Sequence, residues 1–174
     1  MRITGGSLSG RRVECPPGVI RPAMDRMRES LFSVLGPLDG LSFLDLFSGS
    51  GVIALEAISR GASQVTIVER DRGKRAVMEE NLAMVPIRPR VVFAPVERFL
   101  KTSHDTFDLV FADPPFDYRF KNDLLTRIDP LVAAGGRVVL HYPSSDSIVE
   151  KTDRLALVDE RKYGRSMARI FTCE

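Results

Sequence analysis

Residues 43–51 combine a short apolar run with a glycine turn, and this feature restricts the possible folds most strongly. The apolar run covers residues 43–47, and the turn at 48–51 contains two glycines. Residues 52–58 then carry apolar side chains at helical spacing. A strand, a glycine turn and a helix in this order are typical of an open α/β sheet, in which ligands bind at the carboxyl ends of the strands. We therefore expect a binding site at this turn.

Apolar and amphipathic segments alternate along the rest of the chain. Strands are predicted at 42–47, 64–69, 90–93, 107–112 and 136–142. Helices are predicted at 51–60, 72–84, 96–101, 120–132 and, as a short element, 145–150. The last two strands, near 154–160 and 165–172, are joined by Tyr163-Gly164 as a hairpin. This order predicts a Rossmann-like α/β fold, with a mostly parallel seven-stranded sheet, helices on both faces and an antiparallel strand at the C-terminal end.

The first 40 residues depart from this alternation. We expect residues 1–40 to form a basic arm, a hairpin plus a helix packed on the core, and residues 41–174 to form the main domain. Segments 2–4 and 12–15 are expected to pair, and a helix is expected at 24–35. Residues 1–30 hold six arginines against three acids. Arginine suits bidentate contact with phosphates, although a solvated basic face explains the excess equally well.

Composition limits the remaining possibilities. The chain has 174 residues, 44% of them hydrophobic and 28% charged, as expected for one globular domain. No apolar run approaches the roughly 20 residues of a membrane helix, and the first residues lack an apolar signal sequence, so we expect a cytoplasmic protein with no membrane partner. The two cysteines, Cys15 and Cys173, belong to no Cys/His cluster, so no metal site is expected.

The glycine turn fits two classes of nucleotide-binding enzyme. Gly49, Gly51 and Ala54 match the loose dinucleotide fingerprint G-x-G-x-x-G/A, so a nicotinamide enzyme and an S-adenosylmethionine (SAM) enzyme both remain possible. Asp45 favours SAM, because a carboxylate can face the cationic amino-acid part of SAM and would repel a pyrophosphate. Glu69 ends the second predicted strand, where a carboxylate can accept hydrogen bonds from the ribose hydroxyls of either cofactor.

The sequence Asp113-Pro114-Pro115-Phe116 follows the fourth predicted strand, at the same edge of the sheet as the glycine turn. These residue types suit methylation of an amine on an aromatic ring, whose planar nitrogen is a poor nucleophile. The Asp113 carboxylate and the Pro114 carbonyl can accept hydrogen bonds from the two N–H groups and turn the lone pair toward the methyl carbon. Pro115 stiffens that carbonyl, and Phe116 offers a face for stacking. An ordinary proline turn is the structural alternative.

Together, Asp45-Leu-Phe-Ser-Gly-Ser-Gly51 and Asp113-Pro-Pro-Phe116 resemble the motifs of a class I SAM-dependent amino methyltransferase. The arm, with Arg21-Pro22-Ala-Met-Asp25-Arg26-Met-Arg28, is more specifically similar to the RsmD family. These are bacterial enzymes that methylate the N2 atom of one guanine in 16S rRNA. The opening residues 1–6 and the late Lys162-Tyr163-Gly164 fit this family too, so the resemblance spans the whole chain.

The resemblance implies SAM as the methyl donor, S-adenosylhomocysteine as its product, and no metal. The implied partner is 16S rRNA, within or outside an assembling or assembled small ribosomal subunit. The implied catalytic residues are Asp113, Pro114 and Phe116. The implied cofactor-binding residues are Asp45, Phe47, Ser48, Gly49, Gly51, Glu69 and Val96, the last through its backbone N–H because Pro95 has none. The implied RNA-binding residues are Arg11, Arg12, Arg21 and Arg26.

Other functions stay open at this point. A DNA adenine-N6 methyltransferase acts on the same kind of amine but usually carries a target-recognition domain, for which this chain has little room. Protein glutamine methylation usually employs Asn where Asp113 stands. A nicotinamide dehydrogenase gives residues 113–116 no role, and an inactive RNA-binding or ribosome-assembly protein of the same fold gives Asp45, Glu69 and Asp113 none. His141, where relatives often have an acid, is either a general base or a histidine of the core or strand end.

Overall fold

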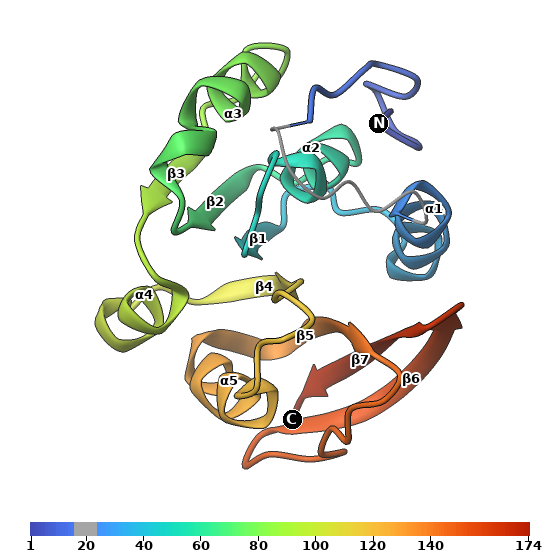
Figure 1. Cartoon of the computed structure of the whole chain (residues 1–174), viewed down its shortest axis with the longest axis vertical. Helices are drawn as coiled ribbons and strands as arrows, with labels where there is room; N and C mark the ends of the chain where they lie inside the picture. The colour runs from blue at the N-terminus through green and yellow to red at the C-terminus, as the bar shows by residue number, and fades with distance from the viewer. Residues whose placement is uncertain (16–23) are drawn as a thin grey trace.

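The computed structural model describes residues 1–15 and 24–174, and within them seven strands form one sheet in the order β3-β2-β1-β4-β5-β7-β6 (Figure 1). The strands are β1 (Ser42–Leu46), β2 (Gln64–Glu69), β3 (Arg90–Phe93), β4 (Phe107–Ala112), β5 (Val132–Pro143), β6 (Leu155–Tyr163) and β7 (Ser166–Cys173). Strands β1 to β5 are parallel, and β7 runs antiparallel between β5 and β6. The predicted mostly parallel sheet with an antiparallel C-terminal strand is confirmed.

Helices cover both faces of the sheet, as predicted. They are α1 (Met24–Leu35), α2 (Val52–Ser59), α3 (Arg75–Leu82), α4 (Val96–Thr102) and α5 (Lys121–Ile128). Buried side chains of α1, α2 and α3 pack with Phe43 and Phe111 in one cluster. Buried side chains of α4 and α5 pack with Leu44 and Val110 in a second cluster. Neighbouring strand residues belong to opposite clusters because side chains alternate between the two faces of a strand.

The strand order reverses between β1 and β4. From β1 the chain continues to β2 and β3 on one side of the sheet, and it then returns to β4 and β5 on the other side. Such a reversal leaves a crevice at the carboxyl ends of the two strands, and ligands of open α/β sheets bind there. Leu46 and Ala112 are partners in the register of β1 and β4. The residues that follow them, the glycine turn and the Asp-Pro-Pro-Phe segment, are therefore neighbours.

The predicted helix at 145–150 is wrong, because this segment forms an irregular loop. Side chains of other elements bind its backbone groups in place of helical hydrogen bonds. The Asn122 amide accepts a hydrogen bond from the Val149 N–H at 2.9 Å and donates one to the Ser147 carbonyl at 3.2 Å. The Arg169 guanidinium donates to the Ile148 carbonyl. The loop thus satisfies its backbone through α5 and β7, which local sequence does not reveal.

Two predicted helices have different bounds in the structure. The helix expected at 120–132 ends at Ile128, followed by a 3₁₀ turn over Asp129–Leu131, and β5 begins directly at Val132. Pro130 in this turn has no N–H to continue the α-helical ladder. The helix expected at 72–84 starts with a 3₁₀ turn, Arg72–Lys74, before α3. There the Asp71 side chain accepts a hydrogen bond from the Gly73 N–H at 2.9 Å.

The predicted N-terminal hairpin is present. An antiparallel bridge joins Arg2 and Arg12, and the Gly10 N–H donates to the Ile3 carbonyl at 2.8 Å. Ile3 and Val13 are buried against the helices of the first cluster. The hairpin is therefore part of the packed structure and contributes to the core.

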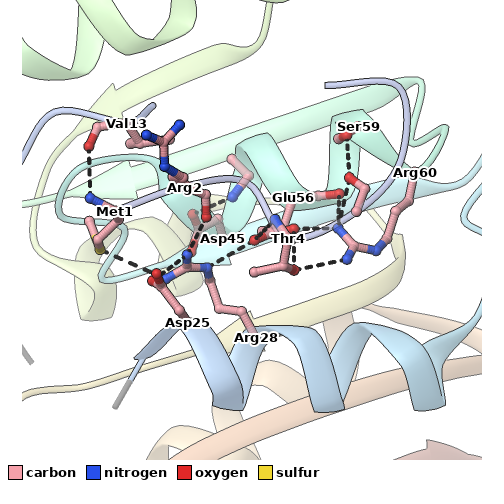
Figure 2. A network of polar contacts seen from close by, with 12 residues as sticks. Met1, Arg2, Thr4, Val13, Asp25, Arg28, Asp45, Glu56, Ser59 and Arg60 are labelled. Carbon is pink, nitrogen blue, oxygen red and sulfur yellow. Dashed lines mark hydrogen bonds and ion pairs between the residues drawn. The ribbon is translucent and has the colours of Figure 1, made fainter. Parts of the chain in front are cut away.

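Figure 2 shows the polar contacts that fix this hairpin to α1 and α2, here called the arm network. The Glu56 carboxylate accepts hydrogen bonds from the Thr4 N–H and from Arg28 Nε, both at 2.9 Å, and it pairs with Arg60. Arg28 also donates to the Arg2 carbonyl at 2.6 Å and to Asp25 at 2.8 Å. The Arg28 and Glu56 side chains are fully buried. Arg28, one of the six arginines of the basic segment, therefore has a structural role.

Candidate active site

The turn after β1 has an unusual backbone. Phe47, Gly49 and Gly51 have φ angles of 62°, 60° and 82°, all in the left-handed region. Glycine adopts such angles readily, but a bulky residue does not, so Phe47 is held there by its surroundings. Its ring contacts Tyr118 edge-on, with 5.4 Å between the ring centroids. A Cβ added at Gly49 would meet no heavy atom within 4 Å, so the backbone there borders open space that a ligand can approach.

Asp45 lies beneath this turn and is almost fully buried. Its carboxyl oxygen accepts hydrogen bonds from the Ser48 hydroxyl at 2.5 Å and from the Ala54 N–H at 3.1 Å, which joins the turn to the start of α2. The pKa of Asp45 is raised to about 7, mainly by burial; the two hydrogen bonds oppose the shift, and the nearby carboxylates of Asp113 and Glu69 add to it. The carboxylates of Asp45, Glu69 and Asp113 thus lie in one site, and a positive charge there would lower the repulsion between them.

Glu69 ends β2 and holds the turn from the other side. Its carboxylate accepts hydrogen bonds from the Gly49 N–H and the Asp71 N–H, both at 2.8 Å, and Lys74 lies 3.4 Å away. A carboxylate has about four acceptor positions, so further hydrogen bonds from hydroxyl groups remain possible. Its position at the strand end agrees with the predicted role in ribose binding, which stays a prediction.

Asp113 follows β4 and begins the Asp-Pro-Pro-Phe segment, residues 113–116, here called the acceptor segment. Its N–H lies 3.4 Å from the Leu46 carbonyl, which places the segment directly beside the glycine turn. Its carboxylate oxygen Oδ1 lies 2.8 Å from Nδ1 of His141, on β5. The Phe116 ring, 37% exposed, packs against the His141 ring with 5.6 Å between centroids. His141 is buried at the strand end, as one of the two sequence hypotheses states, and it contacts two of the predicted catalytic residues.

The loop that follows Phe116 is fixed by groups that sequence reasoning missed. The buried Lys121 ammonium donates to the Phe116 carbonyl at 3.1 Å and pairs with Asp146 at 2.7 Å. The Tyr118 hydroxyl donates to Glu97 at 2.8 Å. Lys121 occupies an ordinary helix position in the sequence, so no local signal marks it. Its ammonium joins the acceptor loop to the loop that replaces the predicted helix at 145–150.

The remaining predicted cofactor residues, Ser48 and Val96, follow the carboxyl ends of two parallel strands, β1 and β3. Ser48 is buried and bonded to Asp45. Val96 is the first residue of α4, where backbone N–H groups have no acceptor within the helix, and its side chain is buried in the second cluster. Its proposed contact with adenine stays a prediction. Pro114 follows Asp113 directly in the acceptor segment.

The predicted RNA-binding arginines lie mainly on the surface. Arg12 is 73% exposed and forms an ion pair with Glu14 at 3.0 Å. Arg11 and Arg26 are exposed, and Arg21 lies outside the described residues. The Asn81 side chain on α3 donates to the carbonyls of Glu14 and Ser50, each at 2.9 Å. Asn81 thereby ties the arginine-bearing strand of the hairpin to the glycine turn.

The described part of the chain contains neither a metal-binding cluster nor a membrane-spanning helix. Among residues 1–15 and 24–174, no group of three or more His, Cys, Asp or Glu residues is arranged to hold a metal ion. In the same residues, no helix has the length and apolar character needed to cross a membrane.

Comparison with known proteins identifies a family, two relatives and a solved structure that resemble this chain. The family model described as "Conserved hypothetical protein 95" matches residues 1–172. "Ribosomal RNA small subunit methyltransferase D" of Escherichia coli (strain K12) is 41% identical over 120 residues, which are 67% of this chain and 60% of that protein. "Putative rRNA methyltransferase YlbH" of Bacillus subtilis (strain 168) is 31% identical over 180 residues, covering 98% of each chain. Among solved structures, "Putative methyltransferase yhhF from Escherichia coli" superposes with a TM-score of 0.90 at 30% identity, covering 100% of this chain and 98% of that one.

Proposed function

Because the chain belongs to the family of conserved hypothetical protein 95, the RsmD family predicted from the sequence, we propose that it is a SAM-dependent rRNA methyltransferase. The finer proposal is that it methylates the exocyclic N2 of a specific guanine in 16S rRNA. One observation carries it: the Asp113 N–H lies 3.4 Å from the Leu46 carbonyl, so the amine-accepting segment adjoins the glycine turn. A cofactor in the turn and an amine at Asp113 would therefore be neighbours.

The glycine turn fits SAM. Open space beside Gly49 lets a ligand approach the backbone, and Glu69 stands where ribose hydroxyls would donate to it. SAM carries positive charge on its sulfonium and amino groups. A cationic ligand suits a site where the nearby carboxylates of Asp113 and Glu69 help to raise the pKa of Asp45, because a positive charge would lower the repulsion between these acids. A nicotinamide dinucleotide would instead bring negatively charged phosphates near the same carboxylates and increase the repulsion.

The acceptor segment fits an aromatic amine. When bound, SAM supplies a methyl group attached to a positively charged sulfur. Asp113 and the Pro114 carbonyl accept hydrogen bonds from the amine, and Phe116 stacks on the base, so that the nitrogen lone pair points at the methyl carbon. The C–S bond of SAM would break as the N–C bond forms, and its electron pair would stay on sulfur. The methylated nitrogen then loses one proton, to Asp113 or water, and S-adenosylhomocysteine leaves.

The basic arm fits the RNA. Arg11, Arg12 and Arg26 are exposed, and Asn81 connects the hairpin to the turn through Glu14 and Ser50. Arginines on a surface fixed to the cofactor turn can hold the phosphates of an RNA whose base enters the site. Chemistry on a base requires that it be unstacked, and the exposed Phe116 ring offers a stacking face for an unstacked guanine.

The test is methyl transfer from labelled SAM to 16S rRNA or to small-subunit particles from cells that lack the modification. We expect label in rRNA, recovered as N2-methylguanosine after digestion to nucleosides. Particles that already carry the modification serve as the matched control and should accept no label. Label found in DNA adenine, in protein glutamine or at another rRNA atom would contradict the finer proposal.

A further inference from the structure

Resting on the proposed function, we infer that His141 is a positioning residue that sets the orientation of both Asp113 and Phe116 in the acceptor site. His141 belongs to β5, whose Leu140 is the register partner of Ala112 at the end of β4. The residues one step further along each strand, Asp113 and His141, therefore lie side by side. Their side chains point to the same face of the sheet, because both follow residues of the opposite face.

The contact with Asp113 fixes the direction of the hydrogen bond. His141 Nδ1 lies 2.8 Å from Asp113 Oδ1, and the histidine side chain is 3% exposed while that of Asp113 is 16% exposed. An ionised carboxylate can only accept, so Nδ1 carries the proton and donates it to the hydrogen bond. A hydrogen bond from this buried donor orients the carboxylate that would receive the amine.

The same ring supports Phe116. The ring centroids of His141 and Phe116 are 5.6 Å apart with 59° between the planes. Phe116 is partly exposed, and the His141 ring is one of the groups against which it packs. One imidazole therefore contacts the group that would hold the amine and the group that would stack on the base.

The other ring nitrogen argues against a purely structural role. Nε2 of His141 is buried and has no hydrogen-bond partner within the described residues. A buried polar atom without a hydrogen-bond partner lowers stability, so an apolar side chain would fill the same space without this cost. What histidine adds at this position is the Nδ1 donor next to Asp113.

Two amide variants test this inference, since they differ in where the donor lies. His141→Asn places its amide nitrogen near the position of Nδ1, whereas His141→Gln places it near that of Nε2. We expect the glutamine variant to lose about tenfold to a hundredfold in kcat, with little change in the Kd for SAM, and the asparagine variant to recover most of this loss. His141→Leu should be as slow as the glutamine variant while its free energy of unfolding equals or exceeds that of the wild type.

Equal kcat values for the asparagine and glutamine variants would overturn the inference, and so would a fully active leucine variant. A second measurement does not depend on activity. The ¹⁵N spectrum of the histidine ring should show a proton on Nδ1, and the signal should shift in Asp113→Ala. A ring protonated on Nε2 alone would refute the hydrogen bond. If the wild type transfers no methyl to rRNA, the proposed function fails, and the ring spectrum still decides the role of His141.

Discussion

Replacing Arg28 by methionine should destabilise the protein strongly, although Arg28 belongs to the basic segment that sequence reasoning associates with RNA. The Arg28 and Glu56 side chains are both fully buried, with 2.9 Å between Nε and the carboxylate. Arg28 also donates to the Arg2 carbonyl and to Asp25. Removing one member of a buried ion pair leaves the other charge without full compensation, which costs about 3–5 kcal/mol. Arg60 still pairs with Glu56, so the lower part of this range is expected.

The assay is unfolding of wild type and Arg28→Met by urea and by heat, monitored by circular dichroism. The matched control is Arg90→Met, which removes an arginine from an exposed pair with Asp105 at 2.8 Å and should change the free energy of unfolding by less than about 1 kcal/mol. For a chain of this size, a loss of 3 kcal/mol lowers the Tm by about 6–12 °C. Equal effects of the two variants would show that the arm network does not stabilise the fold, and the reasoning would be refuted.

Three further predictions concern the site itself. Asp113→Ala should abolish methyl transfer while the Kd for SAM, measured by calorimetry, rises little; collapse of SAM binding would instead give Asp113 a role in holding the cofactor. Neutralising Arg11 and Arg12 together, each to glutamine, should weaken rRNA binding and reduce the slope of log K against log salt by up to about 2, as measured by filter binding; unchanged affinity would assign both arginines a structural role. The pKa of Asp45 is raised from 3.8 to about 7, so between these pH values the folded protein holds a proton that the unfolded chain has released. The contribution of this group to the free energy of unfolding is therefore complete below pH 4 and is lost as the pH rises through 7. Asp45→Asn should therefore gain stability relative to wild type between pH 4 and pH 7, by about 4 kcal/mol at most, in urea titrations across that range, and a pH-independent difference would contradict the buried, protonated form.

The location of the site follows from local patterns. Residues 42–51 specify a strand and a glycine turn, because an apolar run cannot continue through residues that favour positive φ angles. Residues 107–116 specify a strand that two prolines end. Parallel strands bring their carboxyl ends to one edge, so the sequence alone predicts that Asp45, Glu69 and Asp113 lie near each other. The structure agrees, since Leu46 pairs with Ala112 in the register of β1 and β4 and the Gly49 N–H donates to the Glu69 carboxylate.

Local patterns failed where distant residues decide the conformation. The segment 145–150 has a helical pattern, but Asn122 and Arg169 bind its backbone groups and hold it as a loop. The left-handed conformation of Phe47 could not be predicted either, because a bulky residue rarely adopts it without support from the surrounding fold.

The sequence by itself determined the α/β alternation and the glycine turn, because each depends on residues within about a dozen positions of one another. It also determined the acceptor segment and the family, because both are recognised by motifs. Only the tertiary structure decided which charged and polar side chains are buried together. Arg28 with Glu56, His141 with Asp113 and Lys121 with Asp146 are each separated by about 25 residues or more. Such pairs form because packing removes water from both partners, so each must find its hydrogen-bond partners within the protein, and which partners it meets depends on the whole fold.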